Sequence, residues 1–356
     1  MSSEKKELRV GISIGDLNGI GIEVIIKTLS DIRVFQNCTP IIYGSTKSFS
    51  FYRKMIHSPD FNFNTIRTVE GAIPRKVNVL NCWGEEEVKI EPGTPTDISA
   101  RHAFRSFETA VSDIQSSKID VLVTGPVNKY AVQQTGVSFK GHTEYLAEKF
   151  SAKDFLMLLV SDSLRVGVVT GHVPLQQVAS LLSIDIIMQK ARSMHLSLKK
   201  DFGFDRPKIA ILGLNPHAGD NGLIGNEEKE IIAPAIKKLT DENILAYGPY
   251  SADGLFGSPA FTRFDGILAM YHDQGLVPFK SIAFTSGVNF TAGLPIIRTS
   301  PDHGPAFDIA GKNLASESSF REAFYMAQDI YHRRAEYREI SANPLPLGFS
   351  RLSGDQ

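Results

Sequence analysis

Cysteine is scarce in this chain, and neither sign of charge is in excess. The 356 residues include only Cys38 and Cys82, without a CxxC pair or zinc-finger spacing. A disulfide framework is not expected, and a reducing, cytoplasmic compartment fits best. The formal net charge is −1, whereas nucleic-acid-binding proteins normally carry a basic face. We therefore expect no nucleic-acid partner, while a local basic pocket for a small anion stays open.

Long apolar runs are also absent. A helix that crosses a bilayer needs about 18 to 20 apolar residues, and no segment of the sequence approaches that length. The opening MSSEKKELRV contains no apolar core typical of a signal peptide. The expectation is a soluble, cytoplasmic protein with no membrane partner.

The common nucleotide-binding and hydrolase fingerprints are missing as well. SIGDLNGIGIE (13–23) follows a predicted strand and opens a predicted helix, but it is not GxGxxG. No P-loop, GxSxG or HExxH motif occurs, and no signature of a nucleophilic cysteine. Rossmann and P-loop assignments therefore fail on their own motifs.

What the sequence does contain is an alternation of apolar runs and amphipathic stretches. The expected strands cover 9–15, 39–44, 119–126, 155–160, 164–171, 208–214 and 265–270. The expected helices include 21–31, 97–118, 174–182, 184–203 and 225–242. Asp97 or Ser99 is the expected N-cap of the helix over 97–118. The pattern predicts an α/β protein whose parallel strands are connected by helices and buried on both faces.

Three of the expected strands run into a histidine at their carboxyl end. His172 follows LRVGVVTG, His217 follows KIAILGLNP and His272 follows DGILAMY. The carboxyl edge of a parallel sheet is where ligands bind, and imidazoles gathered there suit a divalent metal. Each histidine taken singly is more often an ordinary loop residue. The recurrence favours a shared metal or active site.

His142 lies in a different setting, between a Lys-Gly turn and an expected helix in FKGHTEYLA. His142, Thr143 and Glu144 could cap that helix. Alternatively, the start of the helix could bind a phosphate, because its free N–H groups favour anions.

Polar residues near the third histidine complete the candidate site. Asp273 and Asp253 could orient a ligand histidine or accept a proton, although an aspartate before glycine is usually a turn residue. Lys280, Asn289 and Arg298 would suit a phosphate or carboxylate substrate if they share the crevice.

Taken together, several long motifs resemble those of the 4-hydroxythreonine-4-phosphate dehydrogenase family, which acts in pyridoxal phosphate biosynthesis. They are GDLNGIGIE, TGPVNK, KGHTEYLA, TGHVPL, LNPHAGDNGLIGNEE, GPYSADGLF, YHDQGLVPFK and NFTAGLPIIRTSPDHGPAFDIAGK. The resemblance extends from about residue 9 to residue 335.

The resemblance implies roles for residues at the matching positions. His172, His217 and His272 would be metal ligands at the interface of a homodimer. The substrate contacts would be His142, Thr143, Lys280, Asn289 and Arg298. The metal would be one divalent ion, with zinc, cobalt and magnesium as candidates.

The resemblance also implies a fold with two α/β/α domains and a cleft between them, similar to isocitrate and isopropylmalate dehydrogenases. The first domain, on the cofactor side, would comprise 1–130 plus 281–356. The second, 131–280, would carry the metal histidines and the dimer contacts.

DHGPAFDIAGK is similar to the loop that holds the adenosine half of NAD in those dehydrogenases. The implied contacts to NAD or NADP are Asp302, His303, Gly304 and Asp308. The chain departs from the family pattern at Leu17 and Ile22, where proline is usual, and at Pro305, where threonine or serine is usual. The last change could alter cofactor affinity or the preference between NAD and NADP.

The implied reaction is metal-dependent oxidation of 4-phosphohydroxy-L-threonine to a 3-oxo acid, which loses carbon dioxide to give 3-amino-2-oxopropyl phosphate. Asp273, Asp253 or Lys280 would take the proton. Three alternatives stay open: a dehydrogenase of threonate or erythronate 4-phosphate, a metal-dependent hydrolase or aldolase, and a metal-binding protein without activity.

Overall fold

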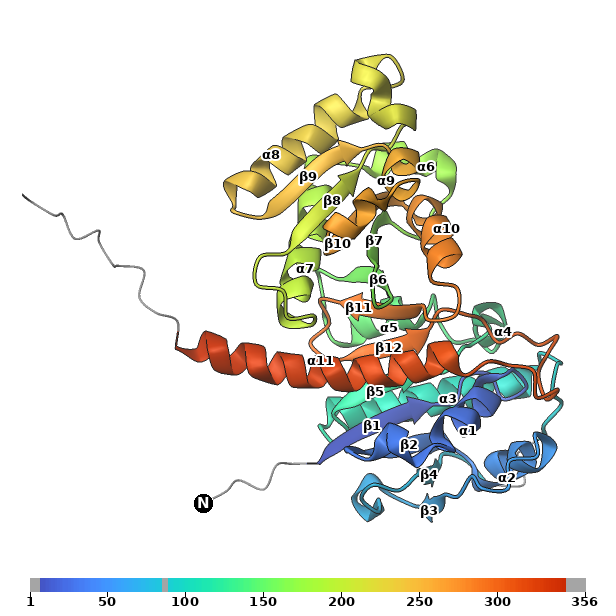
Figure 1. Ribbon diagram of the computed structural model, residues 1–356. Helices are drawn as coiled ribbons and strands as arrows, with labels where there is room; N and C mark the ends of the chain where they lie inside the picture. Colours follow the sequence, from blue (N-terminus) through green and yellow to red (C-terminus); the bar gives the residue numbers. More distant parts are fainter. Residues whose placement is uncertain (1–6, 85–88, 344–356) are drawn as a thin grey trace, which may run out of the picture.

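A single mixed sheet runs through the molecule, with helices on both of its faces (Figure 1). The computed structural model describes residues 7–84 and 89–343. The twelve strands follow the order β3-β4-β2-β1-β5-β12-β11-β6-β7-β10-β8-β9. Within the described ranges no helix is both long and apolar enough to cross a membrane.

The strands are β1 (Leu8–Ser13), β2 (Cys38–Gly44), β3 (Asn64–Ile66), β4 (Asn78–Asn81), β5 (Val121–Thr124), β6 (Leu156–Val160), β7 (Arg165–Thr170), β8 (Lys208–Leu212), β9 (Leu245–Tyr250), β10 (Gly266–Tyr271), β11 (Val288–Ala292) and β12 (Arg298–Pro301). The α-helices are α1 (Gly21–Leu29), α2 (Thr46–Met55), α3 (Asp97–Gln115), α4 (Lys129–Gln134), α5 (His142–Lys149), α6 (Leu175–Leu181), α7 (Ile184–Lys200), α8 (Ala233–Asp241), α9 (Ala252–Phe256), α10 (His272–Ile282) and α11 (Ser318–Ala342). A short π-helical segment, η5 (Glu228–Ile232), leads into α8, and η4 (Pro216–Gly222) follows β8.

The expected α/β class is confirmed, and each strand expected from an apolar run is present. The expectation of parallel pairing throughout is wrong at β6, which pairs antiparallel with both β7 and β11. Only residues 161–164 connect β6 to β7, and a link of that length cannot make the crossover that parallel neighbours require. The expected N-cap of α3 is also wrong, because Thr96 forms a capping box with Ser99.

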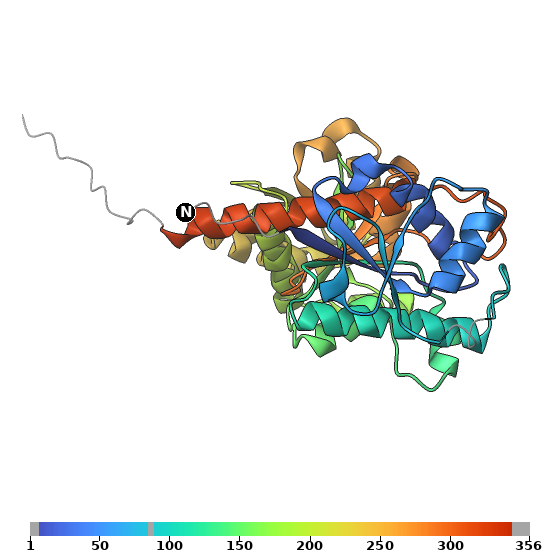
Figure 2. The same cartoon turned by 90° about the horizontal axis from the view of Figure 1, so that it is seen from below.

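Side chains alternate between the two faces of the sheet, so neighbouring residues of one strand enter different cores. Leu268 and Met270 join an apolar cluster beneath α1, α7 and α11 that extends across both halves of the sheet. Ile267 and Ala269 join a smaller cluster with α9 and α10. A third cluster, around Phe107 of α3, packs against the first half of the sheet and α5. Figure 2 shows α3 and α11 on opposite sides of the sheet.

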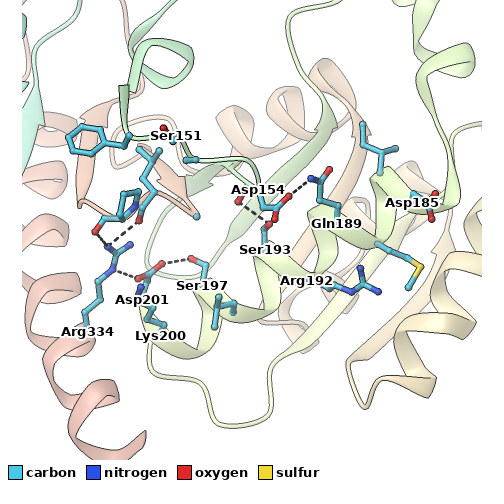
Figure 3. A pocket seen from close by; sticks show the side chains of 18 of the residues that line it. Ser151, Asp154, Asp185, Gln189, Arg192, Ser193, Ser197, Lys200, Asp201 and Arg334 are labelled. Atoms are coloured by element: carbon cyan, nitrogen blue, oxygen red, sulfur yellow. Dashed lines mark hydrogen bonds and ion pairs between the residues drawn. The ribbon is translucent and has the colours of Figure 1, made fainter. Parts of the chain in front are cut away.

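A buried ion pair connects two helices that lie far apart in the sequence. Arg334 of α11 donates from Nε to the Asp201 carboxylate just after α7, at 2.6 Å. Its Nη1 also donates to the carbonyl of Ile296 at 3.1 Å, and Figure 3 shows Arg334 and Asp201 facing each other. The pair joins segments that the predicted domain division assigns to different domains. The boundaries at 130 and 281 themselves stay a prediction.

Replacing Arg334 with methionine is expected to lower the free energy of unfolding by about 3 to 5 kcal/mol, because Asp201 would stay buried without an opposite charge. Urea denaturation measures the loss. The matched control is R333M on the same helix, since the Arg333 side chain is 53% exposed. Equal stability of the two variants would contradict a stabilising role for the pair.

Candidate functional site

A cavity of about 500 Å³ opens between the apolar cluster around α3 and the apolar cluster around α10. Segments that follow β5, β7, β10 and β12 all contribute to its wall. Ten of the residues predicted from the sequence line it: His142, Thr143, His172, His272, Lys280, Asn289, Arg298, Asp302, His303 and Gly304.

Neighbouring parallel strands bring two of the three predicted metal histidines together. β7 and β10 pair with Thr170 opposite Tyr271, and His172 and His272 follow directly beyond the strand ends. The hydroxyl of Thr170 also donates to the carbonyl of Met270 at 2.8 Å. The two imidazole centroids lie 5.6 Å apart. The expectation that these strand ends deliver imidazoles to one edge therefore holds for this pair.

Each of the two histidines has a carboxylate at Nδ1. Oδ1 of Asp273 lies 2.7 Å from Nδ1 of His272, and Oε1 of Glu144 lies 3.6 Å from Nδ1 of His172. At His272 this hydrogen bond leaves Nε2 as the nitrogen available to a metal, whereas the contact at His172 is longer than a hydrogen bond. Asp273 does not line the cavity, and its side chain is 77% exposed.

The third predicted metal ligand, His217, lies elsewhere in the chain. It stands in η4, where residues 217 to 221 all adopt left-handed φ values, and it does not line the cavity. Asp253 lies in the same region, and hydrogen bonding from Ser251 lowers its pKa, with His217 contributing less. Among residues 7–84 and 89–343, no three histidine, cysteine or carboxylate side chains are placed to hold a metal ion. A complete three-histidine site within one chain is thus not present in the described part.

The inner wall of the cavity presents a buried cation. Arg298 is 3% exposed and donates from Nε and Nη2 to the hydroxyl of Thr124, at 3.0 and 2.7 Å. Burial lowers its pKa to about 10, while the nearby carboxylate of Glu144 opposes this shift. With only a neutral hydroxyl as hydrogen-bond partner, this guanidinium can bind an anionic group of a ligand.

His142 occupies the first turn of α5 and packs against Phe107 and Phe139, with ring centroids 4.6 and 5.4 Å away. The capping interpretation is wrong: Gly141 is the N-cap, and no side chain caps the helix. Thr143 instead lies 3.2 Å from the hydroxyl of Thr291. The His142 ring therefore stays free to meet a ligand.

Three buried polar atoms in the cavity wall lack a hydrogen-bond partner among the described residues: Nε2 of His142, Oδ1 of Asn289 and Nε2 of His303. Buried polar groups are almost always satisfied, by protein, water or ligand. Three such atoms around one cavity therefore indicate a polar ligand.

Lys280 reaches from α10 to the segment after β12, where its ammonium lies 3.4 Å from the Asp302 carboxylate. Burial raises the pKa of Asp302, and Lys280 opposes that shift. Burial lowers the pKa of the adjacent His303. These groups form the rim where the predicted cofactor loop begins.

The predicted cofactor loop packs against the glycine-rich segment after β1. The backbone N–H of Ile20 donates to the carbonyl of Pro305 at 2.9 Å. A Cβ on Gly19 would lie 2.9 Å from Pro305, so this close approach requires glycine. Asp308 is exposed and does not line the cavity.

Sequence reasoning missed three charged residues of the wall: Lys129, Lys190 and, except as a helix cap, Glu144. Lys129 stands five residues beyond the end of β5, so the rule that polar residues gather beyond strand ends could have found it. Lys190 lies within α7 and donates to the carbonyl of Phe155 at 2.6 Å. No motif in the sequence near Lys190 predicts this contact.

A larger cavity, of about 1200 Å³, lies between α7 and α11 (Figure 3). None of the predicted site residues lines it. Its polar side chains largely bond to one another, as Ser197 and Arg334 do with Asp201. We therefore take the smaller cavity as the candidate functional site.

Comparison with known proteins shows what the chain as a whole is similar to. The family model of the pyridoxal phosphate biosynthetic protein PdxA matches residues 36–327. A 4-hydroxythreonine-4-phosphate dehydrogenase of Bacteroides thetaiotaomicron is 47% identical over 96% of this chain and 94% of its own length. A provisionally named D-threonate 4-phosphate dehydrogenase of Oceanobacillus iheyensis is 38% identical over 90% of this chain and 97% of its own length. The crystal structure of the 4-hydroxythreonine-4-phosphate dehydrogenase from Klebsiella pneumoniae superposes with a TM-score of 0.80 at 32% identity, covering 92% of this chain and 99% of that one.

The burial of His142 predicts a specific pH dependence of stability. Burial lowers its pKa well below the ordinary value, with Arg298 and Lys129 adding to the effect. As the pH falls below about 6.5, the unfolded chain binds a proton that the folded chain does not, so stability falls by up to about 1.4 kcal/mol per pH unit.

In the variant H142N, the free energy of unfolding should fall less steeply between about pH 7.5 and about pH 5.5, because the contribution of His142 is gone. Urea denaturation at several pH values measures this dependence. The exposed His57 supplies the control H57N. An unchanged slope in H142N would show that His142 is not the group responsible.

Proposed function

The chain belongs to the PdxA family, and we propose that it is a 4-hydroxythreonine-4-phosphate dehydrogenase of pyridoxal phosphate biosynthesis. The observation that carries the proposal is the single cavity that combines a buried arginine, unpartnered polar atoms and a pair of histidines. A phosphorylated hydroxy acid needs each of these: cations for its anionic groups, and a polar centre at the hydroxyl that is oxidised.

The anionic end of the substrate is assigned to Arg298, His142, Thr143 and Asn289, with Lys280 at the rim. Arg298 cannot move away, because Thr124 holds two of its nitrogens. The neutral His142 can donate one hydrogen bond to a phosphate oxygen without adding charge. Ground-state binding at this end fixes the position of the hydroxyl that reacts.

A divalent metal fits the opposite end. His172 and His272 stand beyond neighbouring strand ends, and a carboxylate at Nδ1, as Asp273 provides for His272, is the usual support of a metal-bound imidazole. Nitrogen ligands suit zinc or cobalt better than magnesium. The third ligand, His217, would come from the second chain of a homodimer.

Exposed apolar side chains support the homodimer. Leu175 of α6 is 72% exposed, Leu223 beside η4 is 84% exposed, and Val277 of α10 is 61% exposed. These residues flank the segments that carry the three histidines. A second copy of the chain that packed against these side chains would bury them, and we assign the third metal ligand to its His217.

The reaction removes a hydride from the secondary carbon and a proton from its hydroxyl, which leaves the 3-oxo acid. When bound, the metal supplies positive charge beside that oxygen, and the oxidised nicotinamide of NAD or NADP supplies the hydride acceptor. Of the three candidate proton acceptors only Lys280 lines the cavity, and it would take the proton as the neutral amine, after giving up the proton of the ammonium group that now faces Asp302. Asp273 orients His272, and Asp253 would act only if the partner chain brought it close.

Loss of carbon dioxide from the 3-oxo acid then gives 3-amino-2-oxopropyl phosphate. The cofactor is assigned to the loop from Asp302 to Asp308, where the unpartnered Nε2 of His303 and the exposed Gly304 open toward the cavity. Pro305 stands in this loop where threonine or serine is usual, so a side-chain hydroxyl is missing there. Its absence could alter the preference between NAD and NADP.

The substrate assignment is tested by following NAD(P)+ reduction with 4-phosphohydroxy-L-threonine, threonate 4-phosphate and erythronate 4-phosphate, each with and without chelator. The first substrate should be turned over most efficiently, and chelator should abolish the turnover. A higher kcat/KM for threonate 4-phosphate would favour the reaction named for the Oceanobacillus relative. No reduction with any of them would favour a hydrolase or aldolase.

A site shared between two chains predicts complementation. The variants H217A and H272A should each lack metal-dependent turnover while still folding. Unfolding and refolding an equal mixture should restore about one quarter of wild-type activity, because half of the dimers are mixed and each has one intact site. No recovery, with mixed dimers shown by mass spectrometry, would place all three histidines in one chain.

A further inference from the structure

Glu144 is the one carboxylate in the cavity wall that contacts a predicted metal histidine from a distant part of the sequence. Its Oε1 lies 3.6 Å from Nδ1 of His172, which stands 28 residues further along the chain. By contrast, the partner of His272 is simply the next residue, Asp273. The contact of Glu144 therefore depends on how α5 packs, and not on the local chain.

The position of Glu144 is determined by its helix. α5 places His142 and Glu144 in the same first turn, with His142 wedged between Phe107 and Phe139. A Cβ on Gly141 would lie 2.6 Å from Oε2 of Glu144, so the glycine leaves room for this carboxylate. The same Cβ would lie 3.3 Å from Nζ of Lys129, which places the Lys129 ammonium beside Glu144.

Glu144 thus stands between the two ends of the cavity. Oε1 of Glu144 lies 3.6 Å from Nδ1 of His172, slightly longer than a hydrogen bond, and the Lys129 ammonium lies beside Oε2. Its charge also acts on the buried guanidinium of Arg298. A small rotation of either side chain would bring the Glu144 carboxylate within hydrogen-bond distance of Nδ1–H of His172, and this bond leaves the lone pair of the ring on Nε2.

We propose that Glu144 is a positioning residue, which holds the His172 imidazole in the tautomer and orientation that bind a divalent cation through Nε2. The proposal rests on the metal-dependent function proposed above. On this proposal, two residues in the first turn of α5 have different roles. His142 contacts the anionic end of the substrate, and Glu144, two residues later, orients a ligand of the metal.

The test measures cation binding directly, without turnover. Chelator-treated wild type and E144Q are titrated with Co²⁺, by calorimetry and by the visible absorption of the bound ion. Glutamine keeps the shape of the side chain but loses its charge, so affinity should fall about 10- to 100-fold and the absorption band should change. E148Q is the matched control, one turn further along α5 and exposed, and it should bind Co²⁺ as wild type does.

The outcomes separate this inference from the function on which it rests. If wild type binds Co²⁺, H172A does not, and E144Q binds as tightly as wild type with the same spectrum, the positioning role is wrong while the metal site stands. If wild type itself binds no Co²⁺, the proposed metal site fails and this inference fails with it. Thermal unfolding of E144Q close to that of wild type shows that weaker binding does not reflect a folding defect.

Discussion

The antiparallel strand β11 is the constraint on which the rest of the architecture depends. It forms backbone hydrogen bonds along both edges, to β6 and to β12, and so joins two groups of parallel strands into one sheet. Three successive antiparallel pairings, β12–β11, β11–β6 and β6–β7, reverse the strand direction between the groups. Segments that follow the carboxyl ends of strands from both groups nevertheless line one cavity. Asn289 on β11 and Arg298 at the start of β12 enter the cavity at this junction.

The site keeps polar groups buried and incompletely satisfied. An unsatisfied buried donor or acceptor costs about 1 to 3 kcal/mol, and three such atoms line this cavity. Arg298 adds a buried charge whose hydrogen-bond partner is a neutral hydroxyl. A ligand that supplies the missing partners recovers these costs on binding. The same groups thus lower the stability of the free protein and favour association with an anion.

The sequence predicts those parts of the fold and the site that depend on residues close together in the chain. Apolar runs located β7, β8 and β10, and the histidines beyond them followed from the geometry of parallel sheets. The antiparallel direction of β6 was not predicted. The apolar run FLMLLV indicates a buried strand but not its direction, which is determined by the short link between β6 and β7. β11 and β12 were missed because VNFTA and RTSP mix polar and apolar residues. The contact of Glu144 with His172 was not predicted, because it depends on the packing of α5. The position of His217 away from the cavity depends on the left-handed turn of η4, which the strand-end pattern does not indicate.

The pairing of β5 with β12 has a consequence for synthesis on the ribosome. Val123 lies opposite Thr299, so one edge of β5 has no partner until most of the chain has been made. At about 5 to 20 residues per second, that interval lasts roughly 9 to 35 s. An unpaired, apolar strand edge is a template for pairing with other chains. The first half of this protein therefore passes through a period in which this strand edge is open to pairing with other chains.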